Sequence, residues 1–400
     1  MSDIENYALH LIKILGDAGY ETRIVGGAVR DALLGIPVSD VDLATTAHPE
    51  KVIEILNTAK IKTVPTGLAH GTITAVMEGR GLEITTLRRD IATDGRHATV
   101  SFTDDWHEDA ARRDFTMNAL SRSADGTLYD YFGGLDDAKA GRIRFVGNAA
   151  QRIQEDALRL LRFFRFYAWL GKVMPDEETL AACSAAAPML KKLSRERVWK
   201  EVKRLLSAPD PSDSWMLMLQ NNIVAEFLPE GTNLATLCNL TSYEHARMVG
   251  KKTNPLLRLT ALLHGQKCDA VTLKERFALS VDETQKIAQF LKNPLSGQHE
   301  TDLTTLSFTL HRYGLDLTEE FLVLNMACGA QFNWDSARGM LEKWQPKTFP
   351  LKGEDILGMG LPPGPRVGEI LHAVEEWWVA QNFVPSHAAC IEYAKRMIQN

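Results

Sequence analysis

The sequence predicts an α/β head followed by an all-α neck, body and tail. In the first 146 residues, short runs rich in β-branched residues, such as "TRIVGG" and "GTITAVMEG", alternate with helical segments. From Gln151 almost to the end, apolar residues recur at helical spacing, as in "EDALRLLRFFRFYAWL" and "PLLRLTALLHG". We therefore expect a head over residues 1–146, a neck over 147–208, a body over 209–330 and a tail over 331–400.

The head is expected to open with a helix over residues 4–19, whose apolar residues share one face. "TRIVGG" predicts a short strand that runs into a glycine turn, and "AVRDALLG" predicts a helix ended by Gly35 and Pro37. "DVDLAT" predicts the next strand, and a helix follows near Pro49. "GTITAVMEG" and "GLEITTLRR" predict a hairpin with "EGRG" as its turn, and "IRFVG" predicts one last strand.

The charge balance alone does not indicate a nucleic-acid-binding protein, since 45 basic residues face 51 acidic ones. The distribution is more informative. Three runs are strongly basic: the stretch from Lys139 to Arg165, "KKLSRERVWKEVKRLL" from Lys191, and "ARMVGKKTNPLLR" from Ala246. Basic runs on an acidic chain can mark a track for a polyanion. Solvated helix faces are the alternative explanation of any one run.

Cysteine usage and hydropathy favour a cytoplasmic protein. The five cysteines lie far apart and form no CxxC motif, so neither a zinc site nor a disulfide framework is expected. No apolar run is long enough to span a membrane. The N-terminal stretch "MSDIENYALHLIKILG" lacks the basic start and the cleavage site of a secretory signal.

Two carboxylates, Asp40 and Asp42, follow a glycine pair in "RIVGGAVRDALLGIPVSDVDLATT". Residues two apart on a strand lie on one face, so we expect these side chains side by side, with Val41 and Leu43 facing the core. Adjacent carboxylates repel unless a cation lies between them, and Mg²⁺ uses one or two carboxylates together with water and phosphate oxygens. A strand–Gly-Gly–helix turn brings backbone N–H groups close to phosphate, and Arg30 can reach the same anion. This combination indicates nucleotidyl transfer assisted by two metal ions.

The stretch "VGGAVRDALLG…SDVDLAT" resembles the N-terminal signature of the polymerase-β-like nucleotidyltransferases, in the branch of class II tRNA CCA-adding enzymes and bacterial poly(A) polymerases. Five further motifs follow in the family's order: "HGTITAV…LEITTLRRD…DGRH", "EDAARRDFTMNAL", "DYFGGLDDAKAGRIRFVG", "EDALRLLRFFRF" and "SRERVWKEVKRLL". The resemblance is dense over residues 20–206 and returns at "LPPGPRVGEIL". It implies a polymerase-β-like palm with a mixed sheet as the head, a neck that selects the nucleotide and a tail that contacts tRNA.

The resemblance also implies roles for individual residues. Asp40 and Asp42 match the catalytic aspartates, which bind Mg²⁺. Seven residues match positions that bind the incoming nucleotide: Gly27, Arg30, Arg113, Asp156, Arg159, Arg162 and Arg165. The implied partners are the 3′ end of tRNA, CTP and ATP, with no membrane and no obligate protein partner.

Four of these residues recur every third position, which predicts a slowly drifting stripe on one helix. They are Asp156, Arg159, Arg162 and Arg165. A carboxylate that accepts and a guanidinium that donates hydrogen bonds can together meet the Watson–Crick edge of cytosine or adenine. The alternative is an amphipathic helix with a surface ion pair, worth about 0–1 kcal/mol.

The implied activity is the template-independent addition of C, C and A to the 3′ end of tRNA. A bacterial poly(A) polymerase is one alternative. These enzymes carry a segment similar to "GRRFRLxHV" at the place where this chain has "HGTITAVMEGRGLEITT", which favours CCA addition. An enzyme that adds only A to tRNA remains a second alternative. A catalytically inactive RNA-binding protein is the third, and the intact Asp40–Asp42 pair argues against it.

Two further features stay open at the level of sequence. Glu83, on the expected strand "LEITTL", is compatible with a third carboxylate near the metals and equally with a surface side chain. "DGRH" at Asp94–His97 predicts a mobile loop that helps the change from C to A addition.

Overall fold

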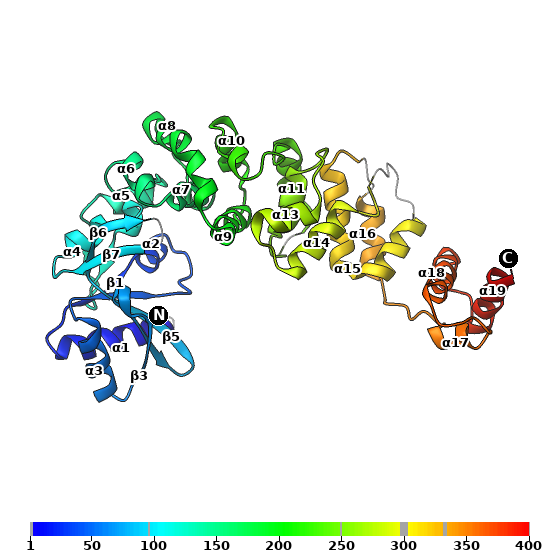
Figure 1. Cartoon of the computed structure of the whole chain (residues 1–400), viewed down its shortest axis with the longest axis horizontal. Helices are drawn as coiled ribbons and strands as arrows, with labels where there is room; N and C mark the ends of the chain where they lie inside the picture. The colour runs from blue at the N-terminus through cyan, green and yellow to red at the C-terminus, as the bar shows by residue number, and fades with distance from the viewer. Residues whose placement is uncertain (1–2, 95–96, 249, 297–302, 331–333, 400) are drawn as a thin grey trace. The chain divides into compact units, whose positions relative to one another are not determined.

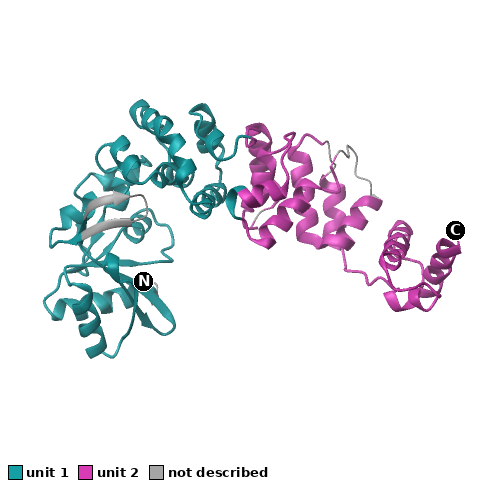
Figure 2. Ribbon diagram, in the orientation of Figure 1, with its two compact units in different colours: residues 1–229, 276–278 teal, residues 230–275, 279–400 magenta. Residues whose placement is uncertain are grey.

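The computed structural model describes residues 3–94, 97–248, 250–296, 303–330 and 334–399. Its elements run from the N-terminus to the C-terminus along the colour scale of Figure 1. By contacts, the chain divides into two compact units, residues 1–229 with 276–278 and residues 230–275 with 279–400 (Figure 2). The division into four parts stays a prediction.

The head is built on a seven-stranded sheet in the order β3-β4-β5-β2-β1-β8-β9. Strands β2 and β5 pair in parallel, and the other neighbours are antiparallel, so the sheet is mixed as predicted. Strands β6 and β7 form a separate antiparallel pair. The bounds are β1 (Thr22–Val25), β2 (Asp42–Thr45), β3 (Lys62–Gly67), β4 (Thr72–Met77), β5 (Arg80–Thr86), β6 (Arg88–Asp94), β7 (His97–Phe102), β8 (Ser121–Arg122) and β9 (Leu128–Tyr129).

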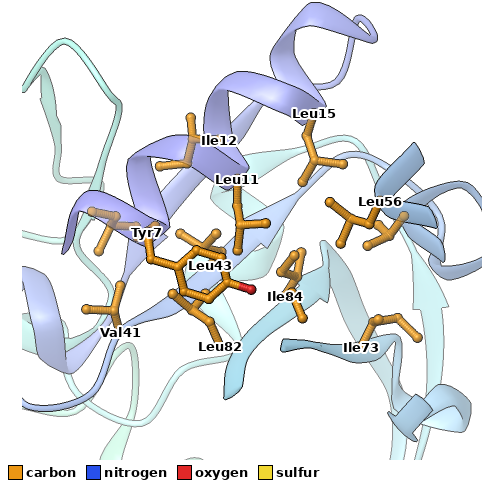
Figure 3. Packing of buried hydrophobic residues seen from close by; sticks show 14 of the residues in the cluster. Tyr7, Leu11, Ile12, Leu15, Val41, Leu43, Leu56, Ile73, Leu82 and Ile84 are labelled. Atoms are coloured by element: carbon orange, nitrogen blue, oxygen red, sulfur yellow. The ribbon is translucent and has the colours of Figure 1, made fainter. Parts of the chain in front are cut away.

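One face of this sheet is covered by the first helix, α1 (Asp3–Asp17). Figure 3 shows Leu11 and Leu15 of α1 pointing toward Leu43 of β2 and Ile84 of β5. These four side chains are completely buried. Burying a leucine or isoleucine contributes roughly 1.5–3 kcal/mol, so this layer holds β2 and β5 in place beside Asp42, the first residue of β2.

The other helices of the first unit lie between the strands of the head or after them. They are α2 (Gly27–Leu33), α3 (Pro49–Thr58), α4 (Trp106–Ala111), α5 (Gly134–Ala140), α6 (Ala149–Glu155), α7 (Leu158–Leu170), α8 (Glu177–Ala186), α9 (Arg195–Leu206) and α10 (Ser212–Gln220). Side-chain caps begin several of them: Asn148 accepts from the backbone N–H of Gln151 at the start of α6, and Asp176 accepts from Thr179 at the start of α8.

The described residues of the second unit form helices and the connections between them, with no strand. Its helices are α11 (Leu234–Arg247), α12 (Pro255–Leu262), α13 (Ala270–Phe277, whose last residues belong to the first unit), α14 (Val281–Leu291), α15 (Leu303–Ala327), α16 (Trp334–Lys343), α17 (Gly353–Leu357), α18 (Pro365–Ala380) and α19 (His387–Gln399). Among the described helices of both units, none has the length and apolar character needed to cross a membrane.

The strand predicted at "IRFVG" is wrong. Only Phe145 of this segment makes a ladder contact, an isolated bridge to Phe115. Its ring packs against Phe115 and Phe163, so the segment is apolar because it fills an aromatic core. Extended pairing stops there because Gly147 turns the chain and Asn148 caps α6.

The loop predicted around "DGRH" is largely a hairpin. Strands β6 and β7 pair as far as Asp94 opposite His97. Gly95 and Arg96 between them lie outside the described residues.

Candidate functional site

A cleft of about 720 Å³ opens in the first unit. Residues from the glycine turn, from the start of β2, from the segment after α4 and from helices α7 and α9 line it. All nine residues singled out from the sequence lie in its wall: Gly27, Arg30, Asp40, Asp42, Arg113, Asp156, Arg159, Arg162 and Arg165. Residues up to 138 positions apart in sequence (27 to 165) therefore meet in one cleft.

The glycine turn depends on Gly26 more than on Gly27. Gly26 precedes α2 with φ 72° and ψ −130°, a backbone conformation that is almost closed to other residues. A Cβ built on Gly26 would also lie 3.1 Å from Nη1 of Arg113. Gly27 has no such φ, and the nearest heavy atom to a Cβ there is Nη2 of Arg30 at 3.6 Å. Gly26 thus sets the turn, while Gly27 leaves room at the cleft wall.

The two aspartates are adjacent, but they do not share a strand. Strand β2 begins at Asp42, opposite Val25, and Asp40 lies in the connection before it. The expectation that both lie on β2 is wrong because β1 ends at the Gly26 turn and leaves Asp40 without a pairing partner. The expected orientation of the flanking residues is confirmed, since Val41 and Leu43 are both buried.

The surroundings of Asp42 disfavour the ionised form of its carboxyl group. The pKa of Asp42 is raised to about 6, and the largest cause is that the cleft wall excludes part of the water from this carboxyl. The negative charges of Asp40 and Glu83 contribute to this rise, while the nearby Arg113 acts in the opposite direction. A cation bound between the carboxylates would remove this repulsion.

Glu83 lies beside Asp42, directly opposite it in the parallel pairing of β2 and β5. It is exposed, and it is not among the residues that line the cleft. Among the residues that the structure describes, no group of three or more His, Cys, Asp or Glu side chains can hold a metal ion. The Asp40–Asp42 pair therefore offers two carboxylates and leaves the remaining positions of a cation to other oxygen atoms.

Arginines dominate the rest of the wall, and buried acids hold them. Asp109 on α4 accepts hydrogen bonds from Arg112 at 2.8 Å and from Arg113 at 3.2 Å. Burial by itself would raise the pKa of Asp109, but the two guanidinium groups outweigh it and hold the pKa below its usual range. Both arginines are thus fixed by one ionised carboxylate.

A chain of hydrogen bonds connects the glycine turn to α7. Nη1 of Arg30 donates to Oδ1 of Asn118 at 2.6 Å, and Nδ2 of Asn118 donates to Asp114 at 3.1 Å. Asp114 also accepts from Nε of Arg162 at 2.7 Å. Burial opposes the ionised form of Asp114, yet Arg162 and Asn118 keep its pKa below the usual range. One segment, "RRDFTMN", therefore links Arg30 and Arg162.

Asp156 does not belong to the helical stripe predicted from the sequence. It lies between α6 and α7 in an extended conformation, because α6 ends at Glu155 and α7 begins at Leu158. Its Oδ1 accepts from the backbone N–H of Leu158 at 3.0 Å, and its Oδ2 accepts from Arg197 at 2.7 Å. The other three members of the predicted stripe lie on α7 as expected.

The arginines of α7 have partners of their own. Arg159 pairs with Glu155 at 2.5 Å, and its Nη1 also donates to the carbonyl of Arg152. Arg165 donates to the buried Glu201 of α9 at 2.6 Å. The alternative interpretation, a surface ion pair within one helix, does not describe Asp156 and Arg159, because Asp156 pairs with Arg197 and Arg159 pairs with Glu155.

The sequence reasoning missed several residues of the cleft. They are Arg88, Arg112, Asp114, Asn118, Leu158, Phe166, Arg197 and Arg204. The motif "EDAARRDFTMNAL" contains Arg112, Asp114 and Asn118. Their polar side chains close to Arg113 are the signal in the sequence that indicates a place in the cleft. Arg197 and Arg204 lie in the basic run from Lys191, where charge alone does not separate them from exposed lysines.

Two segments of the chain match known protein families. Residues 22–144 match the family model "Poly A polymerase head domain", and residues 174–234 match "Probable RNA and SrmB- binding site of polymerase A". The mitochondrial CCA tRNA nucleotidyltransferase 1 of Mus musculus is 34% identical over 396 residues, which cover 96% of this chain and 89% of that protein. The CCA-adding enzyme of Levilactobacillus brevis is 32% identical over 91% of each chain. The chain belongs to the family of CCA-adding tRNA nucleotidyltransferases.

The family assignment extends to the fold. The crystal structure of the Bacillus stearothermophilus CCA-adding enzyme in complex with CTP matches with a TM-score of 0.79 at 28% identity, covering 100% of this chain and 98% of that one. Nucleotidyltransferases of this family generally use divalent metal ions. The carboxylate oxygens of Asp40 and Asp42, which line the cleft, are of the kind that suits such an ion.

The two glycines of the turn should respond differently to substitution by alanine. Gly26→Ala forces a side chain into a disfavoured backbone region and should lower the stability by about 1–3 kcal/mol. Gly27→Ala should keep the thermal unfolding midpoint of the wild type and weaken CTP binding, because its Cβ faces the cleft. Thermal unfolding and CTP titration of both variants test this. Wild-type CTP affinity in Gly27→Ala would contradict it.

The raised pKa of Asp42 predicts that its charge destabilises the metal-free protein. The folded state holds the proton up to about pH 6, whereas the unfolded chain loses it near 3.8, so the stability falls as pH rises between these values. In EDTA, Asp42→Asn should therefore unfold at a higher temperature than the wild type at pH 7.5. The difference should shrink below pH 6 and vanish below pH 3.8. An equal difference at pH 7.5 and pH 3.5 would contradict the raised pKa.

Proposed function

We propose that this protein adds C, C and A to the 3′ end of tRNA, using CTP and ATP and no nucleic-acid template. The observation that carries the proposal is the meeting of the Asp40–Asp42 pair and the Asp156–Arg159 region in one arginine-lined cleft. The first is suited to phosphoryl chemistry, and the second to hydrogen bonding with a base. Relatives named for this activity, and the CTP complex of one of them, support it.

The reaction joins the 3′ hydroxyl of the tRNA to the α-phosphorus of the nucleotide, and pyrophosphate leaves. Asp40 and Asp42 would hold Mg²⁺, the oxygen-preferring cation that fits two carboxylates together with phosphate oxygens. When bound, such ions lower the pKa of the attacking hydroxyl and stabilise the charge on the leaving oxygen.

Four arginines of the cleft would hold the triphosphate. Arg30 and Arg113 lie beside the glycine turn, and Arg162 and Arg165 approach from α7. Their buried carboxylate partners each occupy only part of a guanidinium, which has five N–H donors. The remaining donors are therefore oriented toward the cleft before the nucleotide arrives, and little rearrangement is needed to bind phosphate.

Asp156 and Arg159 would select the base. Cytosine and adenine each present an exocyclic amine beside a ring nitrogen acceptor, whereas uracil and guanine present a carbonyl in place of the amine. Each carboxylate oxygen can accept two hydrogen bonds, so Asp156 can keep Leu158 and Arg197 and still accept from the amine. A carbonyl there would leave the acceptor unsatisfied, at a cost of about 1–3 kcal/mol.

A poly(A) polymerase is the second candidate, because the head matches a family model named for that activity. The named relatives that cover most of the chain favour CCA addition. The cytoplasmic location stays a prediction, since the relatives include mitochondrial enzymes.

Incubation of the protein with tRNA that lacks its CCA end, CTP, ATP and Mg²⁺ tests the activity itself. Products should be longer by three nucleotides, and CTP alone should give two. A ladder of many adenylates formed from ATP alone would identify the poly(A) polymerase instead.

Asp40→Ala and Asp42→Ala should abolish the addition of both C and A while tRNA binding stays close to that of the wild type. The reason is that the carboxylates serve the chemical step and the basic helices hold the tRNA. Product length on denaturing gels and tRNA binding by filter retention measure the two effects. Near-normal turnover of either variant with Mg²⁺ present would show that the aspartates do not hold the metal.

Asp156→Ala should lower the use of CTP and ATP and relax the exclusion of UTP and GTP by roughly tenfold, because the discriminating acceptor is lost. Arg159→Ala should act in the same direction. Lys200→Ala, on an exposed part of α9 outside the cleft, is the control and should weaken tRNA binding without changing nucleotide choice. Incorporation of each of the four nucleotides onto tRNA ending before CCA decides between them. Wild-type selectivity in Asp156→Ala would move base selection elsewhere.

A further inference from the structure

Nine arginines line the cleft, and eight of them have an acceptor on the protein. Their partners are Asp31 for Arg30, the His70 carbonyl for Arg88, Asp109 for Arg112 and Arg113, Glu155 for Arg159, Asp114 for Arg162, Glu201 for Arg165, and Asp156 for Arg197. Arg204 is the exception. Within the described part of the chain its guanidinium has neither a hydrogen bond nor an ion pair, and the residue is exposed.

The charge around Arg204 favours an anion. Burial lowers the pKa of the neighbouring Arg165, and the positive charges of Arg162 and Arg204 act in the same direction, against Glu201. Arg204 therefore adds a like charge to a cluster that already holds two guanidinium groups. A bound phosphate would relieve this repulsion.

The indole of Trp169 contacts the backbone of Arg204. Nε1 of Trp169 donates to the carbonyl oxygen of Arg204 at 2.8 Å. That carbonyl belongs to the last turn of α9, where backbone acceptors lack partners within the helix. The bond fixes the orientation of the indole, yet Trp169 remains 47% exposed. A large ring that is held in place at the surface can serve as a platform on which a nucleic-acid base stacks.

Helix α7 connects this platform to the nucleotide site. Arg162, Arg165 and Trp169 succeed one another at spacings of three and four residues, so they lie along one side of the helix. Trp169 is one turn, about 5–6 Å, beyond Arg165 along the axis. The platform thus continues the row of residues that lines the cleft.

We propose that Trp169 and Arg204 form a subsite for the unpaired nucleotide at the 3′ end of the tRNA substrate, with its base on the indole and its phosphate on the guanidinium. This inference rests on the proposed tRNA activity. Stacking on an aromatic ring combined with a basic contact is how proteins hold single-stranded RNA without reading its sequence. That suits a primer whose last nucleotide changes at each round of addition.

The test compares two tRNA substrates, one ending in the unpaired nucleotide that precedes CCA and one trimmed back to the last base pair. Trp169→Ala and Arg204→Gln should each weaken binding of the first about tenfold and leave binding of the trimmed tRNA nearly unchanged. Arg204→Gln should also reduce the salt dependence of binding by about one counterion. Trp169→Phe should retain most of the affinity, because a ring is kept.

Matched controls separate local from general effects. Lys62→Gln removes one positive charge from β3, an edge strand three strands away from β2. Met174→Ala removes an exposed apolar side chain just beyond α7. Both should bind the two tRNAs as the wild type does. CTP affinity, measured by calorimetry without tRNA, should be unchanged in Trp169→Ala and Arg204→Gln.

Three results would overturn the subsite. Equal losses on both tRNAs would place the contact on the paired stem, and a weakened CTP affinity would make Arg204 part of the triphosphate site. Wild-type binding of both tRNAs in Arg204→Gln and Trp169→Ala would mean that the hydrogen bond from Trp169 to the Arg204 carbonyl only caps the C-terminal end of α9. Failure of the proposed function is distinct, because the wild-type protein itself would then not extend tRNA.

Discussion

Nine arginines line a cleft of about 720 Å³, and the packing around the cleft has to compensate their positive charge. The acids Asp109, Asp114 and Glu201 compensate it by pairing with individual arginines rather than by general neutralisation. Because guanidinium is planar with donors in a fixed fork, each pair also sets the direction of the donors left over. The interactions that make the cleft stable therefore also prepare it for an anion.

The same pairs connect the sheet to the helices that follow it. The segment between α4 and β8 contacts both sides: Asn118 bonds to Arg30 of α2, while Asp114 bonds to Arg162 of α7. Backbone carbonyls of this segment add to the link, since that of Arg113 accepts from Arg152 of α6 at 2.7 Å. In the proposed function, a nucleotide held by the phosphate-facing arginines would thereby be held in register with the junction between α6 and α7. The spacing between the glycine turn and this junction is set by hydrogen bonds within one unit, not by a flexible linker.

Much of this could be predicted from the sequence, because the order of motifs is a local property of the chain. The strand–glycine–helix turn and the helical run after Gln151 could be predicted from residue patterns. The nine proposed site residues were named from residue patterns and the family resemblance, and all of them line the cleft. The errors concern places where distant segments decide the backbone. Asp40 precedes its strand because β1 stops at Gly26, and "IRFVG" is apolar because it fills an aromatic core. The partner of Asp156, Arg197, lies 41 residues away on α9, and no periodicity within α7 could indicate it.

That partnership bears on how selection between bases can work at all. An unsatisfied acceptor imposes a penalty only if it cannot turn toward water, and Asp156 at the edge of a cleft would otherwise be free to do so. Its two oxygens are held separately, one by the N–H of Leu158 and the other by Arg197. Rotation of the carboxylate would break both bonds, so the unused lone pairs keep their direction when the wrong base enters. In the proposed selection of the base, the ion pair with Arg197 is therefore what lets a single carboxylate discriminate an amine from a carbonyl.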